Sequence, residues 1–217
     1  MAKQTPKSSA SPYLMAMLKA FDFCLPTAAK AVPVGPDWIH EIKYDGYRLR
    51  VERQRKTVRL FTRNGHNWTD RFPWIVQAAL KNREQQFVID GEAVVLGVDG
   101  VSDFNALHSR QRDEEVQLYA FDVLALGGED LRQLPTMRKT NLARLLRGRP
   151  DGMFVAPIES DASGTDLFRA ACSMGLEGLA SKRRDRRYNG GRSKDWAKVK
   201  NRIHPAITRV MESFSAR

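Results

Sequence analysis

Apolar and polar side chains alternate along three segments in the first third of the chain, which is the period of a half-buried β-strand. These segments are residues 38–43, 47–53 and 57–63. Asp45 and Gly46 separate the first two, and an Asp-Gly pair between extended runs favours a type I′ turn. The pattern therefore predicts a β-hairpin from the first two segments, followed by a third strand.

Four further segments of the chain are also extended in character. Residues 86–97 contain a second Asp-Gly pair at Asp90 and Gly91, which predicts another turn. Residues 116–126 are almost continuously apolar, which is typical of a strand in the centre of a sheet. The last two expected strands cover residues 176–183 and 196–200.

Helical spacing of apolar residues occurs between these strands and towards both ends of the chain. The expected helices lie at residues 14–18, 68–80, 104–110, 137–146, 167–174 and 207–214. Because the strands are joined mostly by turns and not by βαβ crossovers, the sequence predicts an α+β fold of antiparallel β-sheets flanked by helices.

Composition divides the chain into three parts. Residues 1–12 are rich in Ser, Pro and Lys with few apolar anchors, so we expect this segment to be disordered. Residues 13–203 hold enough apolar side chains for one folded domain. Residues 204–217 are expected to form a basic tail or a short helix.

The net charge indicates which class of molecule the protein binds. The 36 Lys and Arg residues exceed the 25 Asp and Glu residues, which gives a formal net charge of +11. Such an excess favours polyanions through counterion release, and nucleic acid is the commonest of these. A solvated basic surface that aids solubility is the alternative.

Several other classes of protein lack support. Cys24 and Cys172 are too few and too far apart for a disulfide framework or a metal cluster. The sequence contains no GxxxxGK[ST], HExxH or GxSxG motif, which disfavours P-loop, zinc-protease and esterase chemistry. No apolar stretch reaches the length of a membrane span, so we expect a cytoplasmic protein without a membrane partner.

Lys43 is the first candidate for chemistry. It ends an apolar strand, and the period of two places Glu41 on the same face and Ile42 on the other. A nucleophilic lysine must lose its proton, and desolvation and nearby cations both lower the pKa of a lysine. The alternative is an ordinary surface lysine at a strand end. The other charged residues must distinguish between these two interpretations.

Two carboxylates and a further lysine are spread along the chain. Glu92 follows the second Asp-Gly pair, where a carboxylate could hold a ribose hydroxyl or a metal ion; an exposed turn acid is the alternative. Glu177 and Lys182 are five residues apart, so a straight strand would put them on opposite faces. Both can face one site only if the chain bends or bulges at Gly178.

Lys198 and Lys200 are two residues apart and therefore project from one face of a strand, with Val199 on the other. Two amines on one face form a suitable clamp for phosphates. An exposed edge strand is the alternative.

Six motifs then occur in a familiar order: KYDGYR, TRNG, DGEAVV, YAFDVL, EGLASK and WAKVK. In order and spacing this series resembles that of the ATP-dependent DNA ligases, which are covalent nucleotidyltransferases. It is most similar to the ligase module of bacterial end-joining DNA ligase D. The resemblance runs from about residue 38 to residue 200. It implies that residues 13–203 adopt the ATP-grasp-like nucleotidyltransferase, or adenylation, fold of DNA ligases.

The resemblance implies a role for each matching residue. Lys43 corresponds to the nucleophile that attacks ATP, expels pyrophosphate and carries AMP. Arg48 and Arg63 correspond to the pair on the ribose and phosphate, and Phe121 to the aromatic ring that stacks on the base. Nucleotide contacts are implied for Glu41, Arg48, Arg63, Glu92, Phe121, Lys182, Lys198 and Lys200, and metal contacts for Glu92 and Glu177. The carboxylates favour Mg²⁺, with Mn²⁺ as an alternative.

The same resemblance implies a DNA substrate, in the form of nicked or broken duplex. The run KRRDRR supplies Arg183, Arg184, Arg186 and Arg187 as expected contacts to the DNA backbone, and a solvated loop is the alternative. In the family an oligonucleotide-binding barrel normally follows WAKVK, and the 17 residues after Lys200 are too few for one. We therefore expect a monomeric adenylation domain that uses an end-joining partner protein or a separate DNA-clamping domain.

Two other functions stay open at the level of sequence. RNA ligases and capping-type nucleotidyltransferases share the lysyl-nucleotide chemistry, and the choice between ATP and GTP cannot be derived from motif spacing. A non-catalytic DNA-binding module that retains the fold is the alternative from another class. The expected location is the bacterial cytoplasm, in association with the nucleoid.

Overall fold

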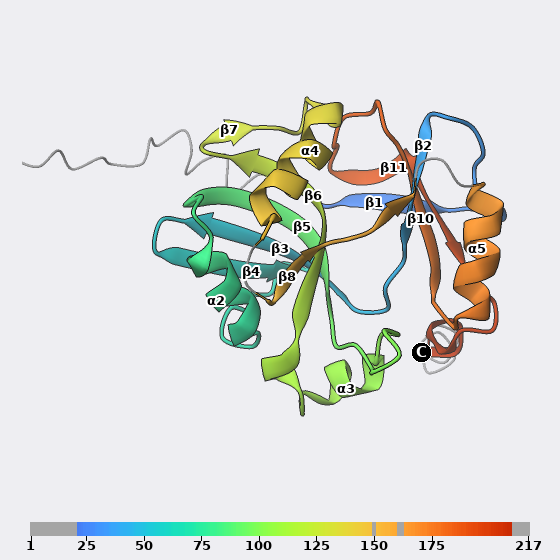
Figure 1. Ribbon diagram of the computed structural model, residues 1–217, viewed down its shortest axis with the longest axis horizontal. Coiled ribbons are helices and arrows are strands. Elements are labelled where there is room, and N and C mark those ends of the chain that lie inside the picture. Colours follow the sequence, from blue (N-terminus) through green and yellow to red (C-terminus); the bar gives the residue numbers. More distant parts are fainter. Residues whose placement is uncertain (1–20, 149–150, 160–162, 210–217) are drawn as a thin grey trace, which may run out of the picture.

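Two β-sheets face each other across a shared apolar layer, and helices cover their outer faces (Figure 1). The computed structural model describes residues 21–148, 151–159 and 163–209. The five-stranded sheet has the order β1 (Cys24–Ala28), β11 (Gly191–Lys200), β10 (Gly178–Arg183), β2 (Trp38–Ile42) and β9 (Ile158–Glu159). The six-stranded sheet has the order β4 (Thr57–Thr62), β3 (Tyr47–Gln54), β5 (Gln86–Val94), β6 (Gln117–Leu126) and β7 (Glu129–Asp130), and β8 (Met153–Val155) also pairs with β6.

Helices pack on both sheets because each sheet has one apolar face turned away from its partner. The helices are α2 (Pro73–Lys81), α3 (Phe104–Ser109), α4 (Pro135–Leu146) and α5 (Gly164–Ser173), with a 3₁₀ turn at η1 (Asp113–Glu115). Alternate residues of β3 and β5, such as Leu49 and Ile89, pack with α2 and α4 in the largest core. Leu179 of β10 and Val199 of β11 pack beneath α5, which covers the five-stranded sheet on the right of Figure 1.

The layer between the sheets depends on two irregularities in β6. In its pairing with β5, the register shifts beside Phe121 and again beside Leu124, so each is the extra residue of a β-bulge. Both side chains join a cluster with Val88 of β5 and with Cys24 and Trp196 of the five-stranded sheet. The bulges thus aim the central strand of one sheet at the other sheet.

The α+β class and most of the elements expected from sequence are confirmed. The expected hairpin across Asp45 and Gly46 is wrong, because β2 pairs with β10 and β9 whereas β3 pairs with β4 and β5. Gly46 does not adopt a positive φ; a Cβ there would meet the carbonyl oxygen of Ala93. The glycine therefore serves a close backbone approach, and residues 43–46 cross from one sheet to the other.

The turn expected at Asp90 and Gly91 is also wrong, since both residues lie inside the continuous strand β5. A Cβ on Gly91 would meet the carbonyl oxygen of Tyr119, so this glycine again permits a close approach of a neighbouring strand. Glu92 consequently projects from a strand and not from a turn.

Two further differences concern pairing and coverage. The sheets are not wholly antiparallel, because β1 runs parallel to β11 and β8 parallel to β6. The helix expected at 14–18 and the segment 1–12 lie outside the described residues, as does the end of the helix expected at 207–214, of which residues 205–209 are helical. Among the described residues, no helix has the length and apolarity needed to cross a bilayer.

The bend required at Gly178 supplies a test of the fold. Gly178 has φ +140°, and an added Cβ would meet the backbone carbonyl of Val199, whereas Gly175 has φ +72° with open space around it. Both alanine substitutions incur the strain of a positive φ, but only Gly178→Ala adds a backbone clash. We expect chemical denaturation to show Gly178→Ala about 1–3 kcal/mol less stable than Gly175→Ala. Equal losses for the two variants would contradict this close packing.

Candidate active site

A cavity of about 910 Å³ opens between the two sheets. Ten residues singled out in the sequence line it: Glu41, Lys43, Arg48, Arg63, Glu92, Phe121, Glu177, Lys182, Lys198 and Lys200. They come from β2, β3, β5, β6, β10, β11 and the segments beside them. The fold therefore gathers into one cavity side chains that are up to 159 residues apart in sequence, from Glu41 to Lys200.

Lys43 lies just beyond β2, where the chain leaves the five-stranded sheet. Its backbone N–H donates to the carbonyl of Gly178 at 2.9 Å, which fixes the base of the side chain. Its Nζ donates to Glu177 Oε2 at 2.5 Å, and Lys200 Nζ lies 2.8 Å from Glu177 Oε1. Glu177 thus holds two lysines, and the positive φ of Gly178 turns it towards the face that carries Lys182.

The protonation of Lys43 differs from the expectation. Burial lowers the pKa of Lys43, but the carboxylates of Glu177 and Glu92 outweigh it, so the pKa is raised above the ordinary lysine value. The expected fall therefore does not occur in this arrangement, because acids and not cations are the nearest charges. Lys198 behaves in the opposite way: burial lowers its pKa, and the charges of Lys43 and Lys200 lower it further.

Glu92 and Glu177 face the same part of the cavity. Burial raises the pKa of Glu92 to about 7, against the opposing charges of Lys43 and Arg48 and with a further contribution from Glu177. Within the described residues, no group of three or more His, Cys, Asp or Glu side chains gathers into a metal cage. Two hard carboxylates that line one cavity nonetheless fit Mg²⁺, which usually binds one or two carboxylates together with substrate phosphates.

The other end of the cavity is built around Glu41. This carboxylate is buried, and it accepts hydrogen bonds from Lys182 on β10 and from Lys139 on α4. Burial raises the pKa of Glu41, but these two ammonium groups outweigh it and leave the pKa lowered. Lys182 itself has a pKa lowered to about 8, because burial and Lys139 oppose its charge more strongly than Glu41 supports it.

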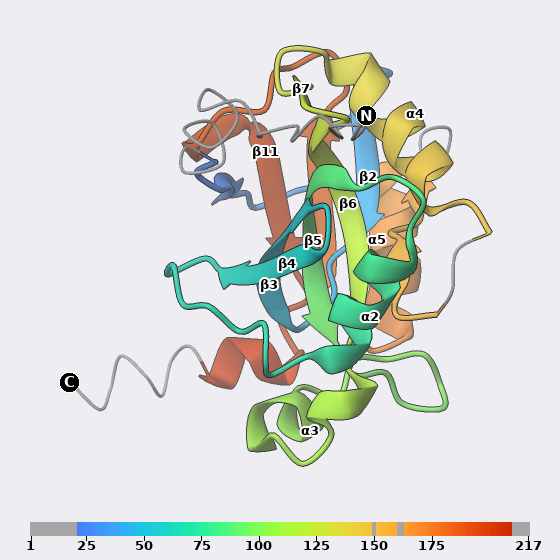
Figure 2. The same cartoon turned by 90° about the vertical axis from the view of Figure 1, so that its left-hand side faces the viewer.

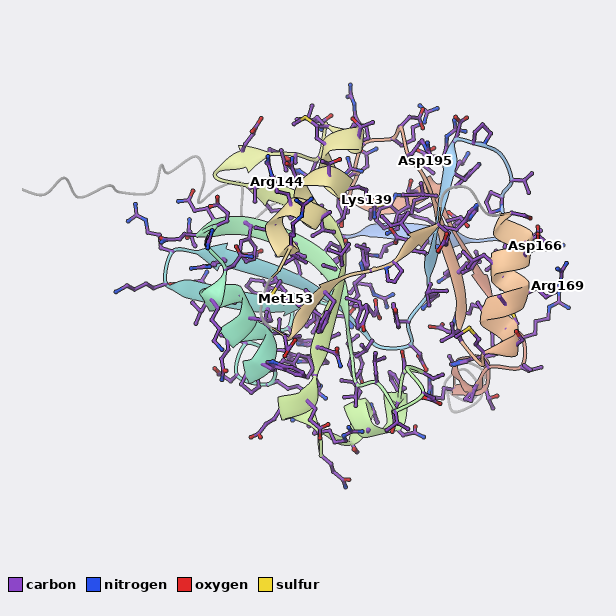
Figure 3. The ribbon with its side chains drawn as sticks, viewed as in Figure 1. Lys139, Arg144, Met153, Asp166, Arg169 and Asp195 are labelled. Carbon is purple, nitrogen blue, oxygen red and sulfur yellow. The ribbon has the colours of Figure 1, made fainter. Side chains whose placement is uncertain are left out.

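Aromatic rings complete this end of the cavity. Lys182 Nζ lies 3.9 Å from the ring centroid of Phe121 and 4.2 Å from that of Trp196. Trp196 and Lys139 were not singled out in the sequence. The role of Lys139 could not be predicted from its place in a helix, because only the fold shows that α4 turns this side chain towards the five-stranded sheet (Figure 3).

Arg48 has a structural task in addition to lining the cavity. Its Nε and Nη2 donate to Asp90 at 2.9 and 2.5 Å, and its Nη1 donates to the carbonyl of Cys24 at 2.7 Å. Tyr188 also donates its hydroxyl to Asp90 at 2.6 Å. Contact of Arg48 with ribose or phosphate stays a prediction. Such a contact would use the N–H groups of Arg48 that are not engaged in these hydrogen bonds. Arg63 is exposed at the rim.

The four arginines of the KRRDRR run lie outside the large cavity. Arg183 pairs with Asp37 at 3.2 Å, and Arg186 lies 3.6 Å from Asp185. Arg184 and Arg187 are exposed. The run therefore contains two arginines near carboxylates, and one of these, Arg186, is exposed like Arg184 and Arg187.

Comparison with known proteins agrees with this arrangement. The family model for the ATP-dependent DNA ligase domain matches residues 20–200. The multifunctional non-homologous end joining protein LigD of Pseudomonas aeruginosa is 38% identical over 187 residues, which cover 82% of this chain and 22% of that protein. A probable DNA ligase of Dictyoglomus turgidum is 32% identical over 176 residues, covering 74% of this chain and 30% of that protein. The chain thus spans less than a third of these relatives.

Solved structures give the same answer. The ligase domain of LigD from M. tuberculosis superposes with a TM-score of 0.74 at 32% identity, covering 84% of this chain and 61% of that one. A mycobacterial DNA ligase D complexed with ATP and MES gives a TM-score of 0.73 at 32% identity, covering 82% and 60%. From its motifs, its two-sheet fold and these matches, the chain belongs to the family of ATP-dependent DNA ligase domains.

Proposed function

We propose that Lys43 attacks the α-phosphate of ATP and carries AMP as the first step in sealing DNA. The observation that supports this most directly is that Lys43 and Lys200 share Glu177 in the same cavity as a separate group of aromatic rings. That second group, the base end, gathers Phe121, Trp196 and the buried Glu41 around Lys182. A nucleotide bound with its base at the base end and its phosphates beside Lys200 would present its α-phosphate to Lys43.

The base end suits adenine. Glu41 is ionised and held by two lysines, so its remaining lone pairs can accept a hydrogen bond from an exocyclic amine. Lys182 can donate to a ring nitrogen, and Phe121 offers a flat surface for stacking. Guanine would present a carbonyl oxygen where adenine presents its amine, and the carboxylate of Glu41 would repel that oxygen.

The chemistry requires Lys43 to be a neutral amine. Its nitrogen forms a P–N bond to the α-phosphate, the bond from that phosphorus to the bridging oxygen breaks, and pyrophosphate leaves. Lys198 and Lys200 would neutralise the phosphates during this displacement. A Mg²⁺ or Mn²⁺ ion held by Glu92 and Glu177 would neutralise the two carboxylates that keep the proton on Lys43, and would screen the phosphate charge.

The second part of the proposal is transfer of AMP to a DNA 5′-phosphate at a nick or break. The net charge of +11 and the exposed Arg184 and Arg187 support a DNA substrate. The relatives named as end joining proteins support a role in end joining. The proposal also places the protein in the bacterial cytoplasm and includes a partner protein or a DNA-clamping domain. We expect the chain to act as a monomer and residues 13–203 to be the adenylating unit.

Incubation with α-³²P-labelled ATP and Mg²⁺, followed by denaturing electrophoresis, should give a labelled chain. Lys43→Ala should remove the label, because it removes the amine proposed to attack the α-phosphate. Lys194→Ala removes an exposed lysine of β11 that does not line the cavity, and it should label like the unchanged protein. Chelation of the metal with EDTA should abolish labelling.

Labelled GTP in place of ATP separates a DNA ligase from a capping-type enzyme. Label from GTP alone would contradict the proposed role of Glu41. Label that survives Lys43→Ala, or no label from either nucleotide, would contradict the proposed nucleophile.

Sealing tests the DNA part separately from adenylation. A pre-adenylated nick should be sealed, with Arg184→Ala/Arg187→Ala slower because two exposed phosphate contacts are lost. Binding to the nick should then lose about 1.8 from the slope of log affinity against log salt, at about 0.9 per contact. Arg183→Ala/Arg186→Ala, whose arginines already face carboxylates, should change the slope less. Tight binding without sealing of any nick would instead favour a non-catalytic module.

A further inference from the structure

The segment that follows β11, residues 201–209, packs against the cavity that Lys198 and Lys200 of β11 line. Asn201 donates its backbone N–H to the carbonyl of Glu177 at 2.8 Å and its side-chain amide to the carbonyl of Leu176 at 3.1 Å. Residues 205–209 are helical, and Ala206 is buried and lines the large cavity. The segment is thus attached at its start to the backbone of a residue proposed to hold the metal.

Its far end is attached to the crossing that carries Lys43. The guanidinium of Arg209 forms an ion pair with Asp45, and its Cζ lies 4.0 Å from the ring centroid of Phe104. Both charged groups are largely withdrawn from water, with side-chain exposures of 31% for Arg209 and 11% for Asp45. An ion pair with little exposure holds its geometry more firmly than a surface pair.

The contacts of Arg209 link segments that follow strands of the two different sheets. Arg209 follows the last strand of the five-stranded sheet, whereas Phe104 begins α3, which follows a strand of the six-stranded sheet. Figures 1 and 2 show the helical segment near α3 at the same end of the molecule. Asp45 pairs with Arg209 from the 43–46 crossing, whose residues belong to neither β2 nor β3.

We propose that Arg209 is a positioning residue that fixes Asp45, and with it the crossing that aims Lys43 into the cavity. This inference rests on the proposed function of Lys43. The backbone of Lys43 is anchored to Gly178 on one side, and Gly46 packs against Ala93 on the other. Within the crossing, Lys43 is held by Glu177 and the ring of Tyr44 packs on that of Tyr119, whereas the side chain of Asp45 is held by Arg209. Without Arg209 the crossing loses the ion pair that fixes Asp45, two residues after the nucleophile.

A displaced nucleophile slows the chemical step more than it weakens binding, and about 1 Å of misplacement can cost about 100-fold in rate. Single-turnover labelling with α-³²P-ATP measures both quantities. We expect Arg209→Ala to lower the maximum rate of lysyl-AMP formation by about 10- to 100-fold. The ATP concentration at half-maximal rate should stay within about twofold, because Arg209 holds the protein and not the phosphates.

Three further variants serve as controls for the effect of Arg209→Ala on the rate. Arg209→Lys keeps the charge and should recover most of the rate. Arg202→Ala removes an exposed arginine from the same segment and should behave like the unchanged chain. In an Asp45→Asn background, Arg209→Ala should have little further effect, since the two residues act as one unit. Arg209→Gln serves in place of the alanine variant if thermal unfolding shows that the latter is not folded.

The outcomes are distinguishable. No label on the unchanged chain contradicts the proposed function itself. Label on the unchanged chain with an equal maximum rate in Arg209→Ala overturns this inference alone. A higher half-saturating ATP concentration with an unchanged maximum rate also overturns it, because Arg209 would then bind the phosphates directly. Equal losses in Arg209→Ala and Arg202→Ala would overturn it as well.

Discussion

The buried carboxylate of Asp90 ties the two sheets together and so determines where the cavity can open. It accepts from Arg48, which starts on β3 and also reaches the carbonyl of Cys24 on β1. It accepts as well from Tyr188, which lies between β10 and β11. Removing one partner of such a buried pair costs about 3–5 kcal/mol. Because this polar cluster and the apolar layer around Trp196 close one side of the gap between the sheets, a cavity remains on the other side.

The charges within that cavity follow one repeated arrangement. Each of two buried glutamates is shared by two lysines: Glu41 by Lys139 and Lys182, and Glu177 by Lys43 and Lys200. Sharing offsets the desolvation of each carboxylate, and it leaves every group with hydrogen-bonding capacity for a nucleotide. It also keeps Lys43 protonated until other charges occupy its acids. In the proposed mechanism, nucleotide and metal binding would therefore be what activates the nucleophile.

The sequence predicted which side chains would gather better than it predicted the path of the chain between them, since ten of the predicted residues line one cavity. Lys198 and Lys200 were placed on one face by the period of a strand, and the bend at Gly178 followed from the odd spacing of Glu177 and Lys182. The turns predicted from the two Asp-Gly pairs are wrong. A glycine needed for close approach to a neighbouring strand looks the same in sequence as a glycine needed for a turn. Lys139, Trp196 and Arg209 gave no signal of their own, since their roles arise from tertiary packing.

The central claim is that Lys43, and no other lysine of the cavity, becomes covalently bound to AMP. Mass spectrometry of peptides from the chain after incubation with ATP and Mg²⁺ tests it most directly. The structure predicts one AMP per chain, on the peptide that contains Lys43, with Lys182, Lys198 and Lys200 unmodified. AMP on any of those three lysines, or nucleotide that is bound tightly but never covalently, would contradict the account.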